Sequence, residues 1–479
     1  MTILSIDQGT SATKALVVTD GGRVLAHAEV AVRPAPTPDG GVEQDPEELW
    51  TSVVEAGSRA VHEAGVAVDA IGFANQGETV LAWDRASGTP IGAAVSWQDR
   101  RAVDVCDELS SQAAELTART GLPLDPYFAA PKMTWLRRRT RGGVITTTDT
   151  WLLHRLTGEY VTDTTTASRT LLMDLDTREW SAVACDAFGF DAADLPRIAG
   201  CAEVIGPTDA FGAQLPVTGL AVDQQAALVG ERCLARGEAK CTYGTGAFLL
   251  ANTGATAVRS RCGLAASVAW AIGDTAAYCL DGQVYTAGEA LAWLRRWGLL
   301  QRAEDLDAVA AAVPDSGGVT VIPALCGLGA PWWRADALGS ILGIGLGTEP
   351  GHVVRATVEG IAAQVALLAR AAATDLGRPF ARLKVDGGLT ASPYLCQTQA
   401  DLLQLPVEVA PSVHATALGV AALARLGAGD AVGLDDALGD TTPLAVYEPA
   451  IGADEALDRL GRFETAVART LTAGAPTTP

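Results

Sequence analysis

One pattern occurs twice in the sequence, about half a chain apart: two short apolar runs joined by a turn of glycine and hydroxyl residues. The first copy covers residues 3–18, with its turn at Gly9-Thr10-Ser11, and the second covers residues 239–254, with its turn at Gly244-Thr245-Gly246. Apolar runs on both sides of a short glycine turn predict antiparallel strand pairs. A chain of 479 residues is also too long for a single core. The repeat therefore predicts two domains, each containing one such hairpin.

Both turns are typical of phosphate binding. Glycine lets backbone N–H groups approach an anion closely, and Thr10, Ser11 and Lys14 add hydroxyl donors and a cation. Asp7 ends the first strand, where a carboxylate could hold a hydrated metal ion. An ordinary polar turn is the alternative, because turns favour the same small residues.

The overall charge argues against a polyanionic partner. The formal net charge is −21, and such a negative surface repels nucleic acid and anionic membranes. An anionic nucleotide would need a local positive pocket, which makes the lysines informative; they are Lys14, Lys132, Lys240 and Lys384. With 48% hydrophobic residues, 19% charged residues and 51 glycines, the composition is that of a compact α/β protein.

The cysteines and histidines indicate a reducing compartment and give no metal-ligand spacing. Nine cysteines occur without a Cys-x-x-Cys pair, and the five histidines are far apart in the sequence. No basic segment with a following apolar core opens the chain, and glycine, polar or charged residues interrupt each long apolar run. We therefore expect a cytoplasmic protein with no membrane partner.

Polar residues follow several predicted strands. A buried strand predicted over residues 68–74 ends in the polar cluster Asn75-Gln76-Gly77-Glu78, and another apolar strand ends just before Asp223. Polar residues at the ends of buried strands are good site candidates in α/β folds. Asp223 also precedes the second hairpin and so lies at the predicted domain junction.

Helices and the chain end complete the prediction. A helix beginning at Pro46, capped by Asp45, and another over residues 357–376 carry apolar residues at helical spacing. A third strand with a glycine turn spans residues 383–392. We predict an N-terminal domain over residues 1–229, a C-terminal domain over residues 230–472 and a frayed tail over residues 473–479.

The ordered motifs of the chain resemble one enzyme family. Asp7-Gln-Gly-Thr, Tyr243-Gly-Thr-Gly and Val385-Asp-Gly-Gly look like the two phosphate motifs and the adenosine motif of the actin-like ATPase superfamily, which includes hexokinases. Trp97-Gln-Asp-Arg-Arg, Ala167-Ser-Arg-Thr and Asp223-Gln-Gln-Ala-Ala resemble motifs of the FGGY carbohydrate kinases, and among them most closely those of glycerol kinases. The resemblance implies an α/β fold of two actin-like ATPase (ribonuclease H-like) domains with an interdomain cleft. No Gly-Lys pair occurs, so a Walker A loop is excluded.

The resemblance also implies transfer of a phosphoryl group from ATP, with Mg²⁺, to an alcohol hydroxyl. Asp223 would be the general base, and a helix N-cap is its alternative role. Asp7 would organise Mg²⁺ through water. The residues implied for the nucleotide are Thr10, Ser11, Lys14, Thr245 and Gly246 around the phosphates, and Gly288, Gly388 and Ser392 near the adenosine. Lys14 stands where glycerol kinases commonly carry arginine.

The acceptor pocket carries the main departure from the family pattern. The resemblance places a set of polar and aromatic residues around a small polyol: Glu78, Trp97, Tyr127, Asp223, Gln224 and Phe248. Glycerol kinases usually carry arginine immediately before this glutamate, whereas this chain has Gly77. The loss of a charged donor changes selectivity, and the glycine leaves space for one or two more carbons. We therefore predict a polyol or ketose of four or five carbons as the acceptor.

Other functions stay open at this point. Glycerol kinase proper and xylulokinase are the alternatives within the family, although the Met-His pair typical of xylulokinases is absent here. An assembly-type or chaperone ATPase with the same fold, or a weakly active regulatory homologue, is an alternative outside it. The only partner that we expect is a small-molecule substrate, with a homodimer or homotetramer as an open alternative.

Overall fold

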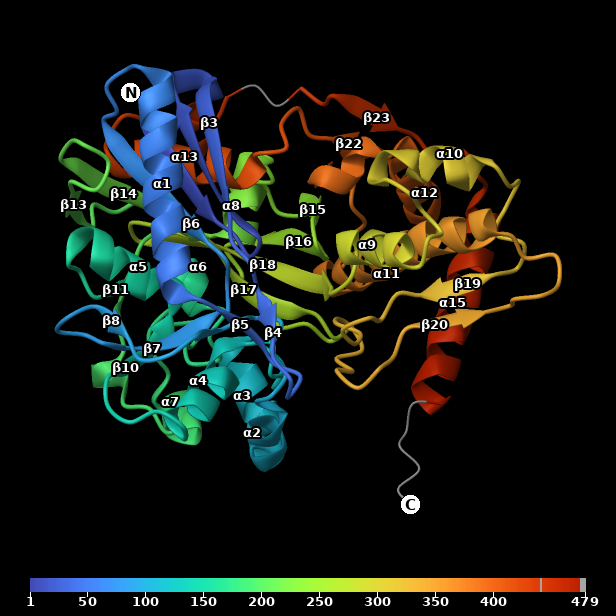
Figure 1. Ribbon diagram of the computed structural model, residues 1–479, viewed down its shortest axis with the longest axis horizontal. Helices are drawn as coiled ribbons and strands as arrows, with labels where there is room; N and C mark the ends of the chain where they lie inside the picture. Colours follow the sequence, from blue (N-terminus) through green and yellow to red (C-terminus); the bar gives the residue numbers. More distant parts are fainter. Residues whose placement is uncertain (440–441, 474–479) are drawn as a thin grey trace.

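Two mixed β-sheets form the centre of the molecule (Figure 1). The structure, a computed structural model, describes residues 1–439 and 442–473. The first sheet has the strand order β13-β14-β6-β1-β2-β3, with β1 (Ile3–Gln8), β2 (Ala12–Val18), β3 (Val24–Ala31), β6 (Ala70–Asn75), β13 (Gly206–Thr208) and β14 (Leu215–Val222). The second has the order β17-β18-β16-β15-β21-β22-β23, with β15 (Ala239–Tyr243), β16 (Ala247–Gly254), β17 (Ala265–Ile272), β18 (Thr275–Val284), β21 (Leu383–Asp386), β22 (Val407–Val409) and β23 (Ala445–Tyr447).

Both predicted hairpins are present, and each stands beside a parallel strand. β1 pairs with β2 and β15 pairs with β16, in both cases antiparallel. β6 lies parallel to β1, and β21 lies parallel to β15. Because the carboxyl ends of parallel strands meet at the same edge of a sheet, the turns that follow β1, β6 and β14 lie together. In the second sheet the same holds for the turns after β15 and β21.

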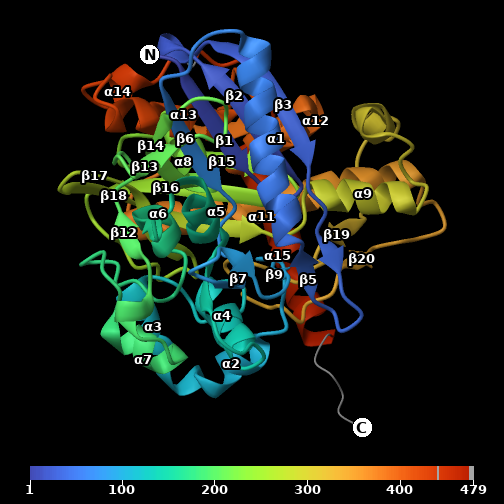
Figure 2. The same ribbon diagram turned by 60° about the vertical axis from the view of Figure 1, so that its left-hand side comes forward.

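Helices cover both faces of the first sheet, and one of them comes from the far end of the chain. α1 (Pro46–Ala64) packs on the face that carries Leu4 and Ile6. α13 (Ala415–Gly427) packs on the opposite face, which carries Ile3 (Figure 2). Successive residues of a strand point to opposite faces, which accounts for this division. The predicted helix at Pro46 is therefore present, with Asp45 Oδ1 accepting a hydrogen bond from Glu47 N at 2.9 Å.

Glycine makes the close approach of α13 to the first sheet possible. A Cβ at Gly219 on β14 would lie 2.4 Å from the backbone nitrogen of Ala424. α8 (Asp223–Gly230) follows β14 directly and also packs against α13. A Cβ at Gly419 of α13 would lie 1.8 Å from the Ala226 carbonyl oxygen of α8. This tight packing fixes the position of the helix that begins at Asp223.

A long central helix supports the second sheet. α11 (Pro350–Leu376) packs against β16 and β18 and begins seven residues earlier than residue 357, because Pro350 is well suited to a first helical position. It is the one helix in the described part of the chain that is long and apolar enough to cross a bilayer, and 78% of its most apolar window is buried inside the protein. Burial of this kind is typical of a core helix.

The other elements surround the two sheets. Short strands from before and after β6 form another sheet: β4 (Ala35–Pro36), β5 (Val42–Gln44), β7 (Val80–Asp84), β8 (Thr89–Pro90), β9 (Ala94–Val95) and β10 (Val144–Thr147). With it are α2 (Val103–Glu108), α3 (Ala113–Thr120), α4 (Ala129–Arg137), α5 (Thr148–Thr157), α6 (Thr164–Ala167), α7 (Ala182–Phe188), β11 (Val161–Asp163) and β12 (Arg197–Ala199). The C-terminal half adds α9 (Gly288–Arg296), α10 (Leu306–Ala311), α12 (Pro393–Leu403), α14 (Leu434–Ala437), α15 (Ala453–Ala473), β19 (Thr320–Ile322) and β20 (Ser340–Leu342).

Two predictions concern the chain end and the cysteines. The predicted tail covers residues 473–479; Ala473 is the last residue of α15, and residues 474–479 lie outside the described part of the chain. All nine cysteines are free, and seven of them are buried, while Cys262 is half-buried and Cys326 is exposed.

Candidate active site

A cleft of about 460 Å³ opens where the turns after β1, β6, β14, β15 and β21 meet. Most of the predicted site residues line it: Asp7, Thr10, Ser11, Lys14, Gly77, Glu78, Trp97, Tyr127, Asp223, Gln224, Thr245, Phe248 and Gly388. The other three, Gly246, Gly288 and Ser392, lie outside its lining. Residues that are far apart in the sequence thus share one cavity, whose phosphate end lies at the two hairpin turns and whose acceptor end lies around Glu78 and Tyr127.

The first hairpin places an acid and a base side by side at the phosphate end. Asp7 on β1 stands directly opposite Lys14 on β2, so both side chains project from the same face of the sheet. Within residues 1–439 and 442–473, no hydrogen bond or ion pair holds the Lys14 ammonium, which lines the cleft. A cation that no protein group holds is suited to bind an anion such as phosphate.

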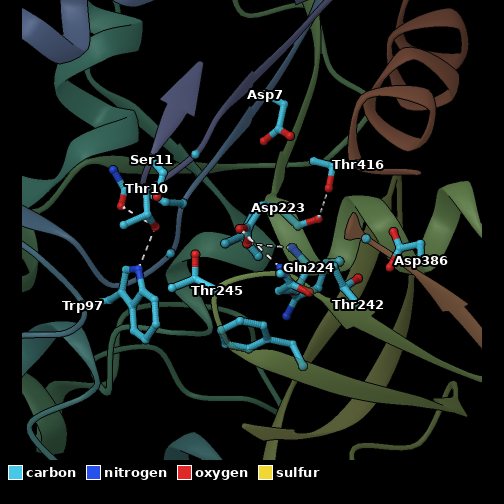
Figure 3. A pocket seen from close by; sticks show the side chains of 18 of the residues that line it. Asp7, Thr10, Ser11, Trp97, Asp223, Gln224, Thr242, Thr245, Asp386 and Thr416 are labelled. Atoms are coloured by element: carbon cyan, nitrogen blue, oxygen red, sulfur yellow. Dashed lines mark hydrogen bonds between the residues drawn. The ribbon is translucent and has the colours of Figure 1, made fainter. Parts of the chain in front are cut away.

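The turn of the first hairpin is tied to the acceptor end. The Thr10 hydroxyl donates to Gln76 Oε1 at 3.2 Å and accepts from Trp97 Nε1 at 2.8 Å (Figure 3). The next residue, Ser11, is exposed and also lines the cleft. A ligand can therefore reach the Ser11 hydroxyl directly, whereas the Thr10 side chain connects the phosphate turn to the acceptor pocket.

The second hairpin presents Thr245 at its tip, and the glycines near it are required by packing. A Cβ at Gly246 would lie 2.6 Å from the Val284 carbonyl oxygen. A Cβ at Gly288 would lie 2.7 Å from the Gly244 carbonyl oxygen. Both distances are too short for a side chain, so the backbone itself demands glycine at these positions. The contacts of Gly246 and Gly288 with a nucleotide stay predictions.

The predicted adenosine residues differ in their surroundings. Gly388 lines the cleft, and nothing lies within 4 Å of the place where its Cβ would stand, so a ligand can approach the backbone. The Ser392 hydroxyl instead caps α12 by accepting from Leu395 N at 3.1 Å, and it donates to Asp307 Oδ1 at 2.5 Å. The structure thus shows a helix cap at Ser392, and its contact with adenosine stays a prediction.

Asp7, Asp223 and Asp386 lie at the phosphate end (Figure 3), and the exposed Glu29, opposite Lys14, adds a fourth carboxylate to its lining. Burial raises the pKa of Asp7 to about 6; Lys14 opposes this shift and Asp386 adds to it. Burial also raises the pKa of Asp386, although Lys240 and Lys14 oppose the shift. Asp386 is not among the predicted site residues, yet it belongs to the Val385-Asp-Gly-Gly motif, so the signal was present in the sequence.

These carboxylates fit a divalent cation. Asp386 Oδ1 is buried without a hydrogen-bond partner among the described residues. Carboxylate oxygens are ligands that Mg²⁺ prefers, and the pKa values are raised chiefly because desolvation disfavours the ionised carboxylates, which a bound cation would stabilise. In the described ranges, no three side chains of the metal-binding types come close enough to hold an ion directly. A cation here would therefore keep several water ligands, as predicted for Asp7.

Asp223 is the first residue of α8, and Val222 is its cap, so the cap alternative does not apply. Asp223 Oδ1 accepts from the backbone nitrogen of Gln224 at 2.7 Å, and Oδ2 lies 3.3 Å from Gln224 Nε2. Burial and the nearby Asp7 raise the pKa of Asp223 to about 6, while Lys240 lowers it. A carboxyl group with a pKa slightly below neutral is mostly ionised at pH 7 and can accept a proton.

A buried lysine that the prediction did not include orients Gln224. The Lys240 side chain is fully buried and its Nζ donates to Gln224 Oε1 at 2.6 Å and to Thr242 Oγ1 at 2.7 Å. Because an ammonium group can only donate, it holds the oxygen of the amide and leaves the amide nitrogen toward Asp223.

Three aromatic side chains form a wall of the acceptor end. Trp97 meets Tyr127 and Phe248 edge to face, with ring centroids 5.9 and 5.8 Å away. The fully buried Lys132 donates to the Pro126 carbonyl oxygen at 2.8 Å and also to the carbonyl oxygens of the next two residues, which holds the loop that carries Tyr127. The flat faces of such rings pack well against the carbon chain of a polyol.

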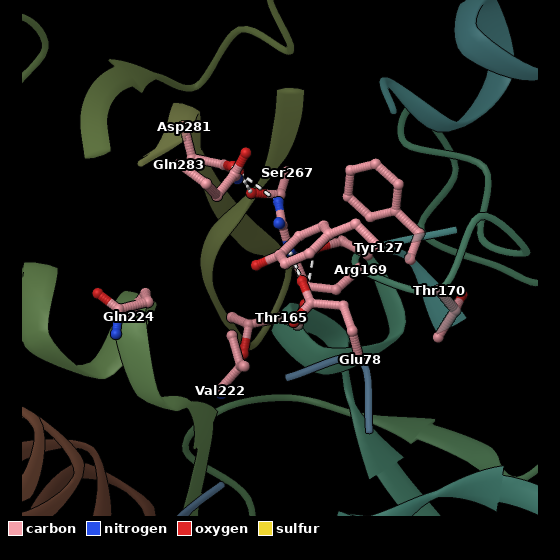
Figure 4. Close-up of polar contacts among 12 residues, drawn as sticks. Glu78, Tyr127, Thr165, Arg169, Thr170, Val222, Gln224, Ser267, Asp281 and Gln283 are labelled. Carbon is pink, nitrogen blue, oxygen red and sulfur yellow. Dashed lines mark hydrogen bonds and ion pairs between the residues drawn. The ribbon is translucent and has the colours of Figure 1, made fainter. Parts of the chain in front are cut away.

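The Glu78 carboxylate is paired inside the protein. Arg169 donates from Nε to Glu78 Oε1 at 2.6 Å and from Nη1 to Asp281 Oδ2 (Figure 4). Arg169 follows α6 and Asp281 lies on β18, so one buried guanidinium joins the two halves of the chain. Neither residue is among the predicted site residues. Arg169 belongs to the Ala167-Ser-Arg-Thr motif, and an acidic residue inside the apolar segment 275–284 was the signal for Asp281.

The backbone at Gly77 leaves no side chain beside Glu78, and Val222 borders the space. A Cβ at Gly77 would lie only 2.9 Å from Val222 Cγ2. Glu78 itself has a φ of 59°, in the left-handed region that side chains other than glycine and asparagine rarely adopt. The Val222 methyl group thus stands against the place where a side chain at position 77 would begin, and space for further carbon atoms of an acceptor stays a prediction. The turn that carries Glu78 is unusual.

Comparison with known proteins identifies the family. Residues 2–230 match the N-terminal domain of the FGGY family of carbohydrate kinases, and residues 239–428 match its C-terminal domain. The chain belongs to this family. It is 41% identical over 487 residues to a glycerol kinase of Alkalilimnicola ehrlichii, with 98% of each chain covered. A crystal structure of Plasmodium falciparum glycerol kinase with ADP matches with a TM-score of 0.88 and 32% identity over 98% of each chain. A ligand-bound xylulose kinase from Lactobacillus acidophilus matches with a TM-score of 0.86 and 22% identity, with 99% of this chain and 98% of that one covered.

Membership of the FGGY family confirms the predicted fold and reaction class. The fold is the two-domain α/β fold of the actin-like kinases. The protein is a phosphotransferase with an alcohol group as acceptor. A kinase of this family uses ATP, and its acceptor is a sugar or a polyol. The likeness to the xylulose kinase, at 22% identity, shows the fold alone.

Proposed function

We propose that this FGGY kinase uses ATP and Mg²⁺ to phosphorylate a hydroxyl group of a polyol or ketose with four or five carbons. The observation that carries the proposal is the absence of a side chain at Gly77, next to the buried Glu78. Position 77 therefore lacks the charged donor that the family resemblance expects there for glycerol. A polar site that loses such a donor loses much of its preference for the substrate that the donor bound.

Asp223 serves as the general base in this proposal. Its carboxylate accepts the proton of the acceptor hydroxyl while the hydroxyl oxygen forms a bond to the γ-phosphorus and the bond to the ADP oxygen breaks. Gln224, held by Lys240, fixes the orientation of the carboxylate. The raised pKa of Asp223, about 6, leaves it ionised at neutral pH and basic enough to take the proton.

The phosphate end binds and orients the triphosphate. Lys14 and Ser11, with the backbone N–H groups of the two hairpin turns, supply the positive charge and the donors. Mg²⁺, when bound, neutralises phosphate charge and polarises the transferred group. Asp7 and Asp386 would hold it through water, because their carboxylates line this end of the cleft.

An assay of ADP release with a panel of acceptors tests the proposed substrate class. The panel contains glycerol, erythritol, threitol, erythrulose, xylitol, xylulose and ribulose. We expect the highest kcat/KM for a four- or five-carbon compound. The highest kcat/KM for glycerol would contradict the proposal, and no acceptor-stimulated ADP release with any compound would favour a regulatory or assembly role instead.

Glycerol kinase proper is the second candidate, and the names of the relatives favour it. A glycerol kinase at 41% identity over 98% of both chains shares most of the same framework. The two candidates predict different preferred acceptors, so the same acceptor panel separates them. A cytoplasmic location, the absence of nucleic-acid and membrane partners, and a dimeric or tetrameric state stay predictions.

A further inference from the structure

The acceptor end has a polar wall on the second sheet that the predicted site does not include. Asp281 and Gln283 alternate on β18, so their side chains project from the same face. Phe248 and Leu250 on β16 stand opposite Gln283 and Asp281, respectively. All four line the cleft. The second sheet thus contributes a carboxylate and an amide beside the aromatic wall.

Both oxygens of the Asp281 carboxylate are already engaged. Oδ2 accepts from Ser267 Oγ at 3.1 Å and from Arg169 Nη1, and Oδ1 accepts from Gln283 Nε2 (Figure 4). Asp281 therefore has an anchoring role. Because a carboxylate can only accept hydrogen bonds, it holds the nitrogen of the Gln283 amide and turns the amide oxygen away.

The Gln283 amide oxygen lacks a partner. Gln283 is 2% exposed, and its Oε1 is buried without a hydrogen-bond donor among the described residues. A buried acceptor of this kind is unfavourable unless a ligand or a water molecule supplies a proton donor. Two other cleft residues carry an unpartnered buried atom, Asp386 and His414, and both lie near Lys14 at the phosphate end. Gln283 carries such an unpartnered buried atom beside the acceptor pocket.

We infer that Gln283 Oε1 accepts a hydrogen bond from an acceptor hydroxyl other than the phosphorylated one, and that this contact favours a longer polyol or ketose over glycerol. The inference rests on the proposed function. The phosphorylated hydroxyl must lie at Asp223, on the first half of the chain, whereas Gln283 belongs to the second sheet. A longer acceptor has a further hydroxyl with which to span the two walls.

The test measures coupling between one side chain and one substrate hydroxyl. For the best four- or five-carbon acceptor, kcat/KM is measured together with that of each of its monodeoxy analogues. In the wild type, one analogue should have a kcat/KM about 10- to 100-fold below that of the parent compound. This analogue lacks a hydroxyl other than the one that is phosphorylated. In Gln283→Leu, the parent compound should lose a similar factor, and the two compounds should then differ by less than about 3-fold. The kcat/KM for glycerol should differ by less than about 3-fold between Gln283→Leu and the wild type.

Controls separate a binding role from a structural one. Gln364→Leu replaces a buried glutamine on α11 that lies outside the cleft lining and should keep the wild-type ratio of parent to analogue. ADP affinity, measured by calorimetry, reports whether Gln283→Leu is folded. The wild-type analogue series is informative even when the variant fails to fold, because the absence of any analogue with a loss above about 3-fold overturns the inference.

The outcomes distinguish this inference from the proposed function. A folded Gln283→Leu that keeps the wild-type ratio overturns the role of Gln283 while the preference for a longer acceptor stands. The highest wild-type kcat/KM for glycerol overturns the proposed acceptor size, and the inference falls with it. A loss of the parent-to-analogue ratio of kcat/KM in Gln283→Leu, but not in Gln364→Leu, supports both the role of Gln283 and the proposed function.

Discussion

The two ends of the cleft hold their charges in different ways. At the phosphate end, the Lys14 ammonium has no ion-pair partner in the described part of the chain, and the half-buried Asp7 and Asp223 and the buried Asp386 have raised pKa values. At the acceptor end, the charges of Arg169, Glu78 and Asp281 compensate one another in a buried network. The first end therefore has charges available for a ligand, and the second has charges that also hold the fold together.

This difference predicts what substitutions do to stability. Removing a carboxylate with a raised pKa at the phosphate end should lower activity while making the protein more stable. Removing a partner from the buried network at the acceptor end should lower both activity and stability, because an unpaired charge stays buried. The variants below test whether the two ends differ in this way.

Asp223→Asn should have the largest effect on catalysis. We expect kcat to fall about 10³- to 10⁴-fold, because the amide cannot accept the proton. The folded-state pKa of Asp223, about 6, lies above the ordinary value of 3.8, so ionisation at pH 7 disfavours the fold. The neutral variant should therefore be more stable by up to about 3 kcal/mol, two pKa units at about 1.4 kcal/mol each. Acceptor-stimulated ADP release and thermal unfolding check the two effects.

The pH profile serves as the control for this variant. Wild-type kcat/KM for the acceptor should fall about tenfold per unit below pH 6, because protonation removes the base. This acid limb should be shallower in the residual activity of Asp223→Asn, where only Asp7, whose pKa is also about 6, still titrates in this range. Asp274→Asn, in the exposed turn between β17 and β18, should change neither activity nor stability. A variant that keeps a tenth of the wild-type kcat would rule out Asp223 as the base.

Arg169→Leu should damage both activity and stability. It leaves Glu78 and Asp281 buried without their cation, and the loss of one partner from a buried ion pair costs about 3–5 kcal/mol. We expect a clearly lower unfolding temperature and a kcat/KM for the acceptor that is about 100-fold or more below the wild type. Arg138→Leu removes an exposed partner of Glu108 and should cost less than about 1 kcal/mol. Similar unfolding temperatures for the two variants would contradict the distinction between the ends of the cleft.

Lys14→Met should act on the nucleotide alone. The loss of one charge-assisted contact should raise the KM for ATP about 10- to 100-fold, with little change in the KM for the acceptor. Stability should fall only slightly, because no hydrogen bond or ion pair in the described ranges holds the Lys14 ammonium and only its charge favours the ionised forms of Asp7 and Asp386. Lys14→Arg should keep the KM for ATP within a few-fold of the wild type. A large loss of stability in Lys14→Met would show that this end of the cleft is also a structural network.

The same difference explains how far the sequence could predict the site. Each hairpin at the phosphate end is contiguous in the sequence, so residues such as Asp7, Lys14 and Thr245 could be predicted from local motifs, and the structure places them in the cleft. Family membership confirmed the two-domain fold that these motifs implied. The helix predicted over residues 357–376 ends at Leu376 as predicted, but it begins seven residues earlier, about two turns, because its start at Pro350 depends on local capping.

The acceptor end could not be predicted in the same way. Arg169 comes from one half of the chain and Asp281 and Gln283, both on β18, from the other, so they meet only after the two halves fold together. Even the predicted contribution of Gly77 depends on a residue distant in sequence, since the Val222 methyl group borders the space that the glycine leaves. The sequence shows that position 77 has no side chain, but the packing of distant residues determines which atoms border that position.

The smallest expected effect, a change in acceptor preference, tests this packing argument directly. Gly77→Arg alone should lower kcat/KM for all acceptors, because even its Cβ would lie 2.9 Å from Val222 Cγ2. Adding Val222→Gly removes the obstructing methyl group, and we expect the double variant to shift the ratio of glycerol to four-carbon kcat/KM about tenfold toward glycerol. Val222→Gly alone should leave this ratio within about threefold of the wild type, because it supplies no donor. The three variants and the wild type form a double-mutant cycle in which the two positions should be coupled, since their side chains share one space. Additive effects of the two substitutions would show that Val222 does not limit the residue at position 77.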